Sequence, residues 1–179
     1  MKIKIKLFEG GHIPEKTAKG DWMDISMPED GSLKPVYANT LHNNRTVRDV
    51  NFDNQLFRLG FSVALPKGYE AYVLPRSSTY NKYGVDLCNT MPVIDNSFRG
   101  DNDEWKANIK AYRETSWQSG DRLFQMRIQL SQYATIWQKI KWLFWNGKIE
   151  FVVVDSLGST DRGTSLTNNT TNKVESKND

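Results

Sequence analysis

The sequence is poor in the residue types that form disulfides, redox centres and metal sites. Its 179 residues include one cysteine, Cys88, which excludes an internal disulfide framework and makes a reducing cytoplasm the expected compartment. The two histidines, His12 and His42, are too few and too scattered for a Cys/His metal site or a cysteine–histidine catalytic pair. Any chemistry must therefore depend on other side chains.

Long apolar runs and a strong excess of one charge are also lacking. No stretch approaches the roughly 20 apolar residues that cross a bilayer, and the alternating lysines of residues 1–7 do not resemble a signal peptide. A net charge of +3 suits a small anionic ligand but falls far short of the concentrated basic surface of a dedicated nucleic-acid binder. We expect a cytoplasmic protein that binds neither membranes nor nucleic acids.

What the sequence does contain is apolar alternation of period two, which is typical of half-buried strands. With 38% hydrophobic residues, the chain can bury the core of one domain. Short strand-like segments between Gly, Pro, Asn and Asp clusters favour an all-β sandwich or barrel over a βαβ fold. The predicted strands are Ile3 to Leu7, Phe57 to Leu65, Tyr69 to Leu74 after a turn at 66–68, Phe124 to Leu130, and a buried strand at 149–154.

Three segments depart from this alternation. Residues 38–55 are polar and rich in asparagine, which predicts a long surface loop. Residues 164–179 contain two aliphatic residues and no aromatic one, which predicts a flexible tail. Residues 134–145 predict a short amphipathic helix that ends at Asn146-Gly147. Its apolar residues are Ile136, Trp137, Ile140, Leu143 and Phe144. We expect it to pack on the barrel or on a sister subunit; a membrane-surface role is disfavoured because the helix carries few cations.

Pro75-Arg76-Ser77-Ser78 is the first segment with chemical potential. Residues 77–83 predict a turn or two of helix that starts at one of the two serines, and helix N-termini offer amides to phosphate. Arg76 adds a planar fork that can hold two phosphate oxygens at once. For this segment alone, an ordinary N-cap beside a surface arginine is the simpler interpretation.

A second segment begins at Asn89 and contains Val93, Ile94 and Asp95. The two apolar residues before the aspartate predict a strand that ends in a partly buried carboxylate, which suits a general base for water. A turn aspartate that caps its own backbone is an equal alternative. The Asn89 amide can read the edge of a base, and Phe98 can stack on a sugar or belong to the core.

A third segment, Gly120-Asp121-Arg122 with Gln125, predicts a turn that enters a strand. Asp121 and Arg122 have structural roles in this interpretation. Gln125 alternates with Phe124 and Met126, so its side chain leaves the core face and can reach a ligand.

In this order the segments resemble the five motifs of the trimeric dUTP pyrophosphatase (dUTPase) family. The matches are Gly20 to Ile25 for motif one, in the GDW form of Gram-positive and phage members, Pro75 to Ser78 for motif two, Asn89 to Gly100 for motif three, Gly120 to Gln125 for motif four and Asp161-Arg162-Gly163 for the start of motif five. The resemblance implies one dUTPase-like β domain over residues 1–163, with a helical insertion at 134–146, followed by the tail at 164–179.

The family resemblance also implies an assembly and a reaction. Members are homotrimers of distorted jelly rolls (β-clip barrels), and their active sites are shared between subunits. Asp95 would activate a water that attacks the α-phosphorus of dUTP, giving dUMP and pyrophosphate.

Roles for the other site residues follow from the same resemblance. The phosphates would be held by Arg76, Ser77, Ser78, Gln125 and Arg162. The uracil and sugar would lie against Asn89, Val93, Ile94 and Phe98. Magnesium would sit on the triphosphate oxygens and on waters, with Asp24 as an anchor through water, which suits a hard cation that keeps its hydration shell.

Motif five is where the sequence departs most from the family. After Gly163 the family has a glycine-rich run with an aromatic lid for uracil, whereas this chain has Thr164 to Asn169. Trp105 is a candidate replacement lid, and a core or interface tryptophan is the alternative. Pro92 and Phe98 are milder departures, standing where the family usually has glycine and tyrosine.

Two other functions are weighed against dUTP hydrolysis. A catalytically weak trimer that binds a nucleotide or a protein would explain the divergent motif five and the inserted helix. Deamination of dCTP, a sister activity on this fold, needs a second arginine that Thr79 to Gly84 does not contain.

Overall fold

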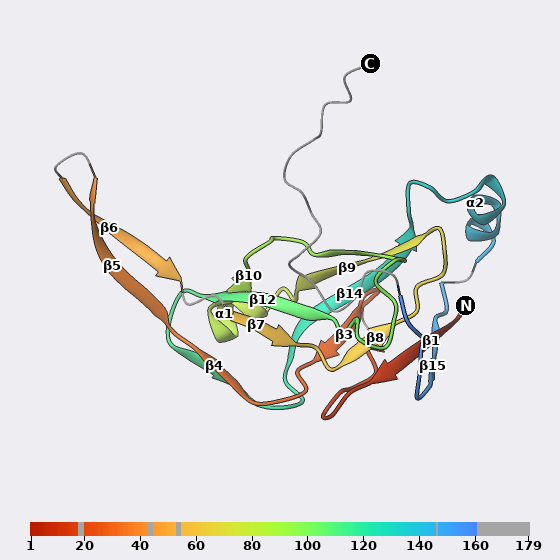
Figure 1. Ribbon diagram of the computed structural model, residues 1–179, viewed down its shortest axis with the longest axis horizontal. Helices are drawn as coiled ribbons and strands as arrows, with labels where there is room; N and C mark the ends of the chain where they lie inside the picture. The colour runs from red at the N-terminus through yellow and green to blue at the C-terminus, as the bar shows by residue number, and fades with distance from the viewer. Residues whose placement is uncertain (18–19, 43–44, 53–54, 146, 161–179) are drawn as a thin grey trace, which may run out of the picture.

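The computed structural model describes residues 1–17, 20–42, 45–52, 55–145 and 147–160 (Figure 1). Strands dominate these residues, and two short helices accompany them. The elements up to residue 63 are β1 (Lys2–Leu7), β2 (Glu15–Lys16), β3 (Met23–Ser26), β4 (Gly31–Leu33), β5 (Pro35–His42), β6 (Arg45–Phe52), β7 (Gln55–Arg58) and β8 (Phe61–Val63). The later elements are β9 (Tyr69–Pro75), α1 (Thr79–Tyr83), β10 (Val85–Leu87), β11 (Val93–Asp95), β12 (Lys106–Ala111), β13 (Thr115–Trp117), β14 (Arg122–Leu130), α2 (Ile136–Leu143) and β15 (Glu150–Val153).

A five-stranded sheet carries most of the predicted site residues. Its strand order is β11-β9-β14-β3-β2, and each neighbouring pair is antiparallel. The pairing of β9 with β14 extends from Pro75 opposite Phe124 to Tyr69 opposite Leu130. Because β14 lies between β9 and β3, the end of β9, the start of β14 and strand β3 are neighbours although they are far apart in the sequence.

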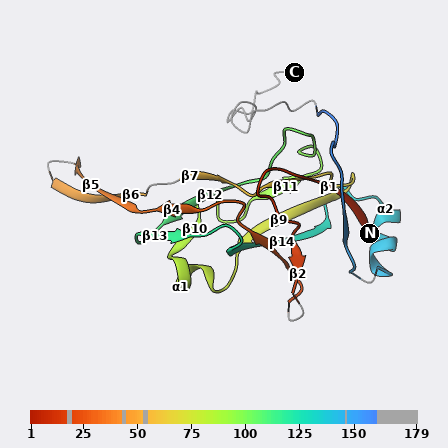
Figure 2. The same cartoon turned by 90° about the horizontal axis from the view of Figure 1, so that it is seen from below.

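Smaller sheets surround the five-stranded one. Two of them have the orders β15-β1-β8 and β10-β12-β7, and β15 runs parallel to β1. Strands β13 and β4 pair with each other, as do β5 and β6. The β5–β6 hairpin projects from one end of the molecule, and α2 lies at the opposite end (Figures 1 and 2).

The apolar alternation predicted from the sequence forms the core. Ile3 and Ile5 of β1 are buried, and so are alternating residues of β14 from Phe124 to Ile128. Burying each large apolar side chain contributes about 1.5–3 kcal/mol, so this alternation determines which face of each strand turns inward. The expected all-β architecture is confirmed.

The predicted continuous strand from Phe57 to Leu65 is wrong. Its alternate apolar residues are buried as expected, but they belong to β7 and β8, which lie in different sheets. The break comes at Gly60, whose φ is +80°. The backbone of Gly60 also lies close to Gly11, because a Cβ at Gly60 would lie 2.6 Å from the Gly11 Cα. Burial periodicity cannot reveal such a change of sheet.

The predicted loop at 38–55 is also wrong. Most of this segment forms the β5–β6 hairpin, with pairs from Pro35 opposite Phe52 to His42 opposite Arg45. Asparagine is depleted in strands, so its abundance in this segment indicated a loop where strands form.

The strand predicted at 149–154 forms, but it is not buried. β15 occupies Glu150–Val153, and the side chain of Val153 is 51% exposed. Its described pairing is with β1 alone, so one edge of β15 faces outward in the single chain.

The predicted amphipathic helix is confirmed as α2. A capping box begins it, because the Thr135 hydroxyl accepts from the Gln138 amide and the Gln138 side chain accepts from the Thr135 amide. The helix ends at Leu143, earlier than expected, with Phe144 as its C-cap. None of its residues is buried, and Leu143 is 78% exposed. No described helix is long and apolar enough to cross a membrane.

Candidate active site

An ion-paired cluster forms where the ends of β3, β9 and β14 lie side by side. Arg76, directly after β9, places Nε 2.9 Å from Oδ1 of Asp24 on β3. Arg122, at the start of β14, places Nη1 3.3 Å from Oδ2 of the same carboxylate. Asp24 is only 6% exposed, so one nearly buried carboxylate holds two guanidinium groups.

A β-bulge in β14 helps to position this cluster. The register with β3 shifts between Arg122 and Phe124, so both Leu123 and Phe124 are buried. The Arg76 amide donates to the Leu123 carbonyl at 3.1 Å, and the Arg76 Nη1 donates to the Arg122 carbonyl at 3.2 Å. The start of β14 therefore holds Arg76 through both its backbone amide and its guanidinium.

Gln125 lies beside this cluster, as its alternation predicted. It pairs with Leu74 of β9 and with Asp24 of β3, and its side chain is half-buried. Its Nε2 donates to the Pro75 carbonyl at 3.1 Å. Arg76, Ser77, Ser78 and Gln125 together are called the phosphate cradle below.

The serines of the phosphate cradle are exposed. Helix α1 forms as predicted and Ser78 occupies its N-cap position, but the Ser78 side chain makes no capping hydrogen bond. The turn is instead fixed by Thr79, whose amide donates to the Arg76 carbonyl and whose hydroxyl donates to the Leu123 carbonyl. Both serine side chains are thus presented to solvent next to Arg76.

Asp95 ends β11, but its carboxylate is exposed, so the predicted partial burial is wrong for the single chain. The reason is that β11 is a three-residue edge strand paired only with β9 among the described residues. Oδ1 accepts from the Ser97 amide at 2.7 Å and from the Ser97 hydroxyl at 2.6 Å. This is the turn-capping geometry that the sequence left open, and it fixes the orientation of the carboxylate.

The residues predicted to contact base and sugar lie within six positions of Asp95 along the chain. Asn89 lies exposed in the turn after β10, and Val93 is exposed on the same face of β11 as Asp95. Ile94 and Phe98 are partly buried and pack against the core. The side chains of Asn89 and Val93 are thus exposed to solvent, while those of Ile94 and Phe98 lie between them and the core.

The prediction that Trp105 forms a lid over uracil is wrong. The Trp105 side chain is 1% exposed and packs on Phe61, with ring centroids 5.3 Å apart. Trp105 continues the inward face of β12, where Ala107 and Ile109 are also buried. That period-two signal was present in the sequence and predicts the core position.

β9 separates Asp95 from the phosphate cradle of the same chain. Asp95 pairs with Glu70 near the start of β9, whereas Arg76 follows the last residue of that strand. Six residues at about 3.3 Å each place the two positions about 20 Å apart along the strand. Asp95 and Arg76 of one chain therefore cannot contact the same phosphate group.

Comparison with known proteins gives the family. No protein-family model matches the chain. The sequence is 37% identical over 164 residues to the SPbeta prophage-derived deoxyuridine 5'-triphosphate nucleotidohydrolase YosS of Bacillus subtilis strain 168, which covers 91% of this chain and 94% of the relative. The chain belongs to the dUTPase family.

Solved dUTPases have the same fold. A dUTPase from phage phi11 of S. aureus matches with a TM-score of 0.58 at 17% identity, over 75% of this chain and 94% of that one. A dUTPase from Streptococcus mutans matches with a TM-score of 0.55 at 19% identity, over 74% of this chain and 98% of that one. The phi11 protein is described as coordinating a structural Mg(II) ion.

The dUTPase resemblance assigned Asp24 to a magnesium site, and its surroundings fit that role poorly. Both carboxylate oxygens are paired with guanidinium groups, which repel a cation. Within the described part of the chain, no three His, Cys, Asp or Glu side chains are grouped to hold a metal. Asp24 fits better as the residue that positions Arg76.

A cavity of about 540 Å³ is lined in part by Asp21 and Met23 of the motif-one segment but by none of the predicted site residues. It lies between the α2 region and the β3–β14 face, and no member of the phosphate cradle contributes to it. Its lining residues are Lys16, Asp21, Met23, Arg127, Ile128, Trp142, Trp145, Gly147, Lys148 and Ile149.

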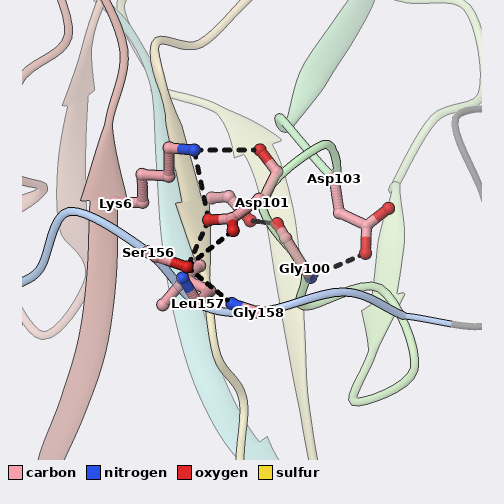
Figure 3. Close-up of polar contacts among 8 residues, drawn as sticks. Lys6, Gly100, Asp101, Asp103, Ser156, Leu157 and Gly158 are labelled. Atoms are coloured by element: carbon pink, nitrogen blue, oxygen red, sulfur yellow. Dashed lines mark hydrogen bonds and ion pairs between the residues drawn. The ribbon is translucent and has the colours of Figure 1, made fainter.

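The loop after Asp95 contains contacts that the sequence did not reveal. Asp101 binds the segment that follows β15, through the Leu157 amide at 2.8 Å and the Ser156 hydroxyl at 2.7 Å (Figure 3). Lys6 of β1 donates to the same carboxylate at 3.1 Å. These donors, above all the Leu157 amide, lower the pKa of Asp101 to about 2. Partners more than 50 residues apart leave no local signal in a sequence.

The start of motif five, Asp161-Arg162-Gly163, and the tail at 164–179 lie outside the described residues. The last described residue is Thr160, and Arg162 follows it by two positions in the sequence.

Proposed function

We propose that this chain hydrolyses dUTP to dUMP and pyrophosphate as a homotrimer whose active sites combine two subunits. Asp95 of one subunit would face the phosphate cradle of the next. The observation that supports this arrangement is the separation of about 20 Å between Asp95 and Arg76 along β9. Membership of the dUTPase family supports the substrate.

Asp95 supplies the general base in this proposal. Its exposed carboxylate accepts a proton from water while Ser97 holds Oδ1 in a fixed orientation. The water oxygen bonds to the α-phosphorus, the bond from that phosphorus to the bridging oxygen breaks, and pyrophosphate leaves with the released electron pair. The proton passes from Asp95 to solvent. Such a base typically contributes about 10²- to 10⁴-fold in rate.

The phosphate cradle holds the triphosphate. Asp24 holds the Arg76 guanidinium at its Nε, which orients the planar fork before substrate arrives. The hydroxyls of Ser77 and Ser78 and the amide of Gln125 supply further contacts to phosphate oxygens. Arg162 adds a guanidinium from the C-terminal segment.

The base and sugar lie on the surface around β11. Asn89 and Val93 contact uracil beside Ile94, and Phe98 contacts the deoxyribose from below. A magnesium ion on the triphosphate oxygens would supply neutralisation of phosphate charge.

The first test is pyrophosphate release from dUTP in the presence of magnesium. The wild-type protein should turn over dUTP, and Asp95→Asn should reduce kcat/KM at least about 100-fold, because asparagine cannot accept the proton. The matched control is Asp155→Asn, which removes an exposed carboxylate outside the site. Ammonia release from dCTP, measured in parallel, tests the deaminase alternative.

A second candidate function is protein binding by a catalytically weak trimer. The observation that favours it is the exposed apolar surface of α2, where Trp137 is 70% and Phe144 86% exposed. If the wild-type protein does not hydrolyse dUTP, the catalytic proposal fails and this alternative becomes the stronger one.

A further inference from the structure

The cavity between the α2 region and the β3–β14 face has a lining that suits a small anion. Its volume of about 540 Å³ lies within the range of small-molecule sites. The charged side chains of its wall are Lys16, Asp21, Arg127 and Lys148. Three cations and one carboxylate give the wall a net charge of +2, which balances the charge of about −1.5 to −2 on a phosphate monoester.

Arg127 is the cation with the most donors to offer a ligand. Its side chain is exposed on the outer face of β14, between the buried residues Met126 and Ile128. In the part of the chain that the structure describes, its guanidinium makes no ion pair or hydrogen bond. Lys16, by contrast, lies 3.5 Å from Asp21. The planar fork of Arg127 can hold two phosphate oxygens at once.

Two indole rings form an aromatic part of the same wall. Trp142 and Trp145 both line the cavity, with ring centroids 4.6 Å apart, and Trp142 also packs on Tyr69 at 5.9 Å. Gln138 Nε2 holds α2 beside the sheet by donating to the Lys67 carbonyl at 2.6 Å. These contacts order the rings before a ligand enters, and aromatic rings of this kind stack on nucleobases.

The indole N–H of Trp145 gives an independent indication of a missing partner. Its Nε1 is buried and has no hydrogen-bond acceptor among the described residues. Trp105 and Trp117 share this feature, but they lie in the core, whereas Trp145 lines the cavity. An unpaired buried donor is unfavourable, and a ligand oxygen or ring nitrogen beside the indole would pair with it.

We propose that this cavity binds a nucleoside monophosphate, with the phosphate on Arg127 and Lys16 and the base against Trp142 and Trp145. Neither Asp95 nor the phosphate cradle takes part, so the proposal does not depend on dUTP hydrolysis. The cavity is nevertheless a neighbour of the phosphate cradle, because Gln125 and Arg127 are two residues apart on the same face of β14. Its test must therefore distinguish the two places.

The test measures binding of AMP, adenosine and inorganic phosphate to the full-length protein by isothermal titration calorimetry. AMP carries a purine, which differs in shape and edge groups from uracil. We expect AMP to bind, and adenosine and inorganic phosphate to bind at least about tenfold more weakly, because each provides only one of the two kinds of contact. Absence of AMP binding up to about 10 mM would refute the proposal, as would equal affinity for AMP and inorganic phosphate.

Variants then locate the ligand. Arg127→Gln should weaken AMP binding about three- to tenfold, a modest factor because this guanidinium is exposed. Trp145→Leu should weaken binding of AMP and leave that of inorganic phosphate unchanged. Lys106→Gln is the matched control, because Lys106 is an exposed cation on β12 and does not line the cavity. Equal effects of Arg127→Gln and Lys106→Gln would show general charge attraction and overturn the proposal.

Arg76→Ala separates the cavity from the phosphate cradle. It should leave AMP binding unchanged, since Arg76 does not line the cavity. Loss of AMP binding in Arg76→Ala, with Arg127→Gln unaffected, would place the ligand in the cradle and contradict the proposal. All of these measurements read binding and not turnover, so they remain decisive even if the wild-type protein does not hydrolyse dUTP.

Discussion

At Asp24, two guanidinium groups share one nearly buried carboxylate, and this explains why a residue expected to anchor a cation is better suited to orient an arginine. A free Arg76 side chain would lose substantial rotamer freedom on binding phosphate. By holding Nε, Asp24 would remove part of that loss in advance, and Nη1 is held as well because it donates to the Arg122 carbonyl.

Asp24→Asn tests this role at the residue scale. Asparagine has a similar shape but cannot neutralise two guanidinium groups, so KM for dUTP should rise. Stability should fall by about 1–3 kcal/mol, less than for a fully buried pair because both arginines are partly exposed. Asp21→Asn is the control, since its side chain is 95% exposed and its pair with Lys16 spans 3.5 Å. Thermal unfolding and steady-state kinetics measure both variants, and equal effects would contradict the role assigned to Asp24.

At the scale of elements, the five-stranded sheet brings three distant motifs together, while the junction between β7 and β8 lets the chain pass from one sheet to another. Gly60 makes that junction possible because its φ is positive and its backbone lies against Gly11. The apolar alternation of period two correctly predicted which residues of β7 and β8 are buried. It wrongly predicted that the two strands are one continuous strand.

Gly60→Ala should destabilise the fold through both strain and crowding. Gly120 is the matched control, because its φ of +86° is similar and nothing lies within 4 Å of a Cβ built there. We expect Gly120→Ala to cost about 1 kcal/mol and Gly60→Ala distinctly more, by denaturant unfolding. Similar losses in both variants would show that crowding at the junction is unimportant.

At the scale of the whole molecule, the sequence predicted the components of the site better than their arrangement. Local patterns located α1, α2 and the motif residues because capping, turn chemistry and alternation depend on neighbours in the chain. The exposure of Asp95 and the β5–β6 hairpin depend on strand pairing, which such patterns do not specify. The hydrogen bonds of Asp101 to Ser156 and Leu157 were missed for the same reason, since the partners lie more than 50 residues apart.

In the proposed function, the separation of Asp95 from the phosphate cradle makes assembly necessary. A neighbouring chain would supply the missing half of each site, and closed threefold symmetry would supply one neighbour for every half-site. The exposed edge of β15 and the exposed face of α2 are further surfaces that an assembly can cover.

Complementation between subunits tests this shared site most directly. Asp95→Asn and Arg76→Ala chains, each inactive alone, are co-expressed in equal amounts with different affinity tags. In every mixed trimer, one site of three pairs an intact Asp95 with an intact Arg76. Because about three quarters of randomly assembled trimers are mixed, activity should recover to about a quarter of the wild-type level. Activity no higher than that of the two parent variants, despite proven mixed trimers, would contradict the account.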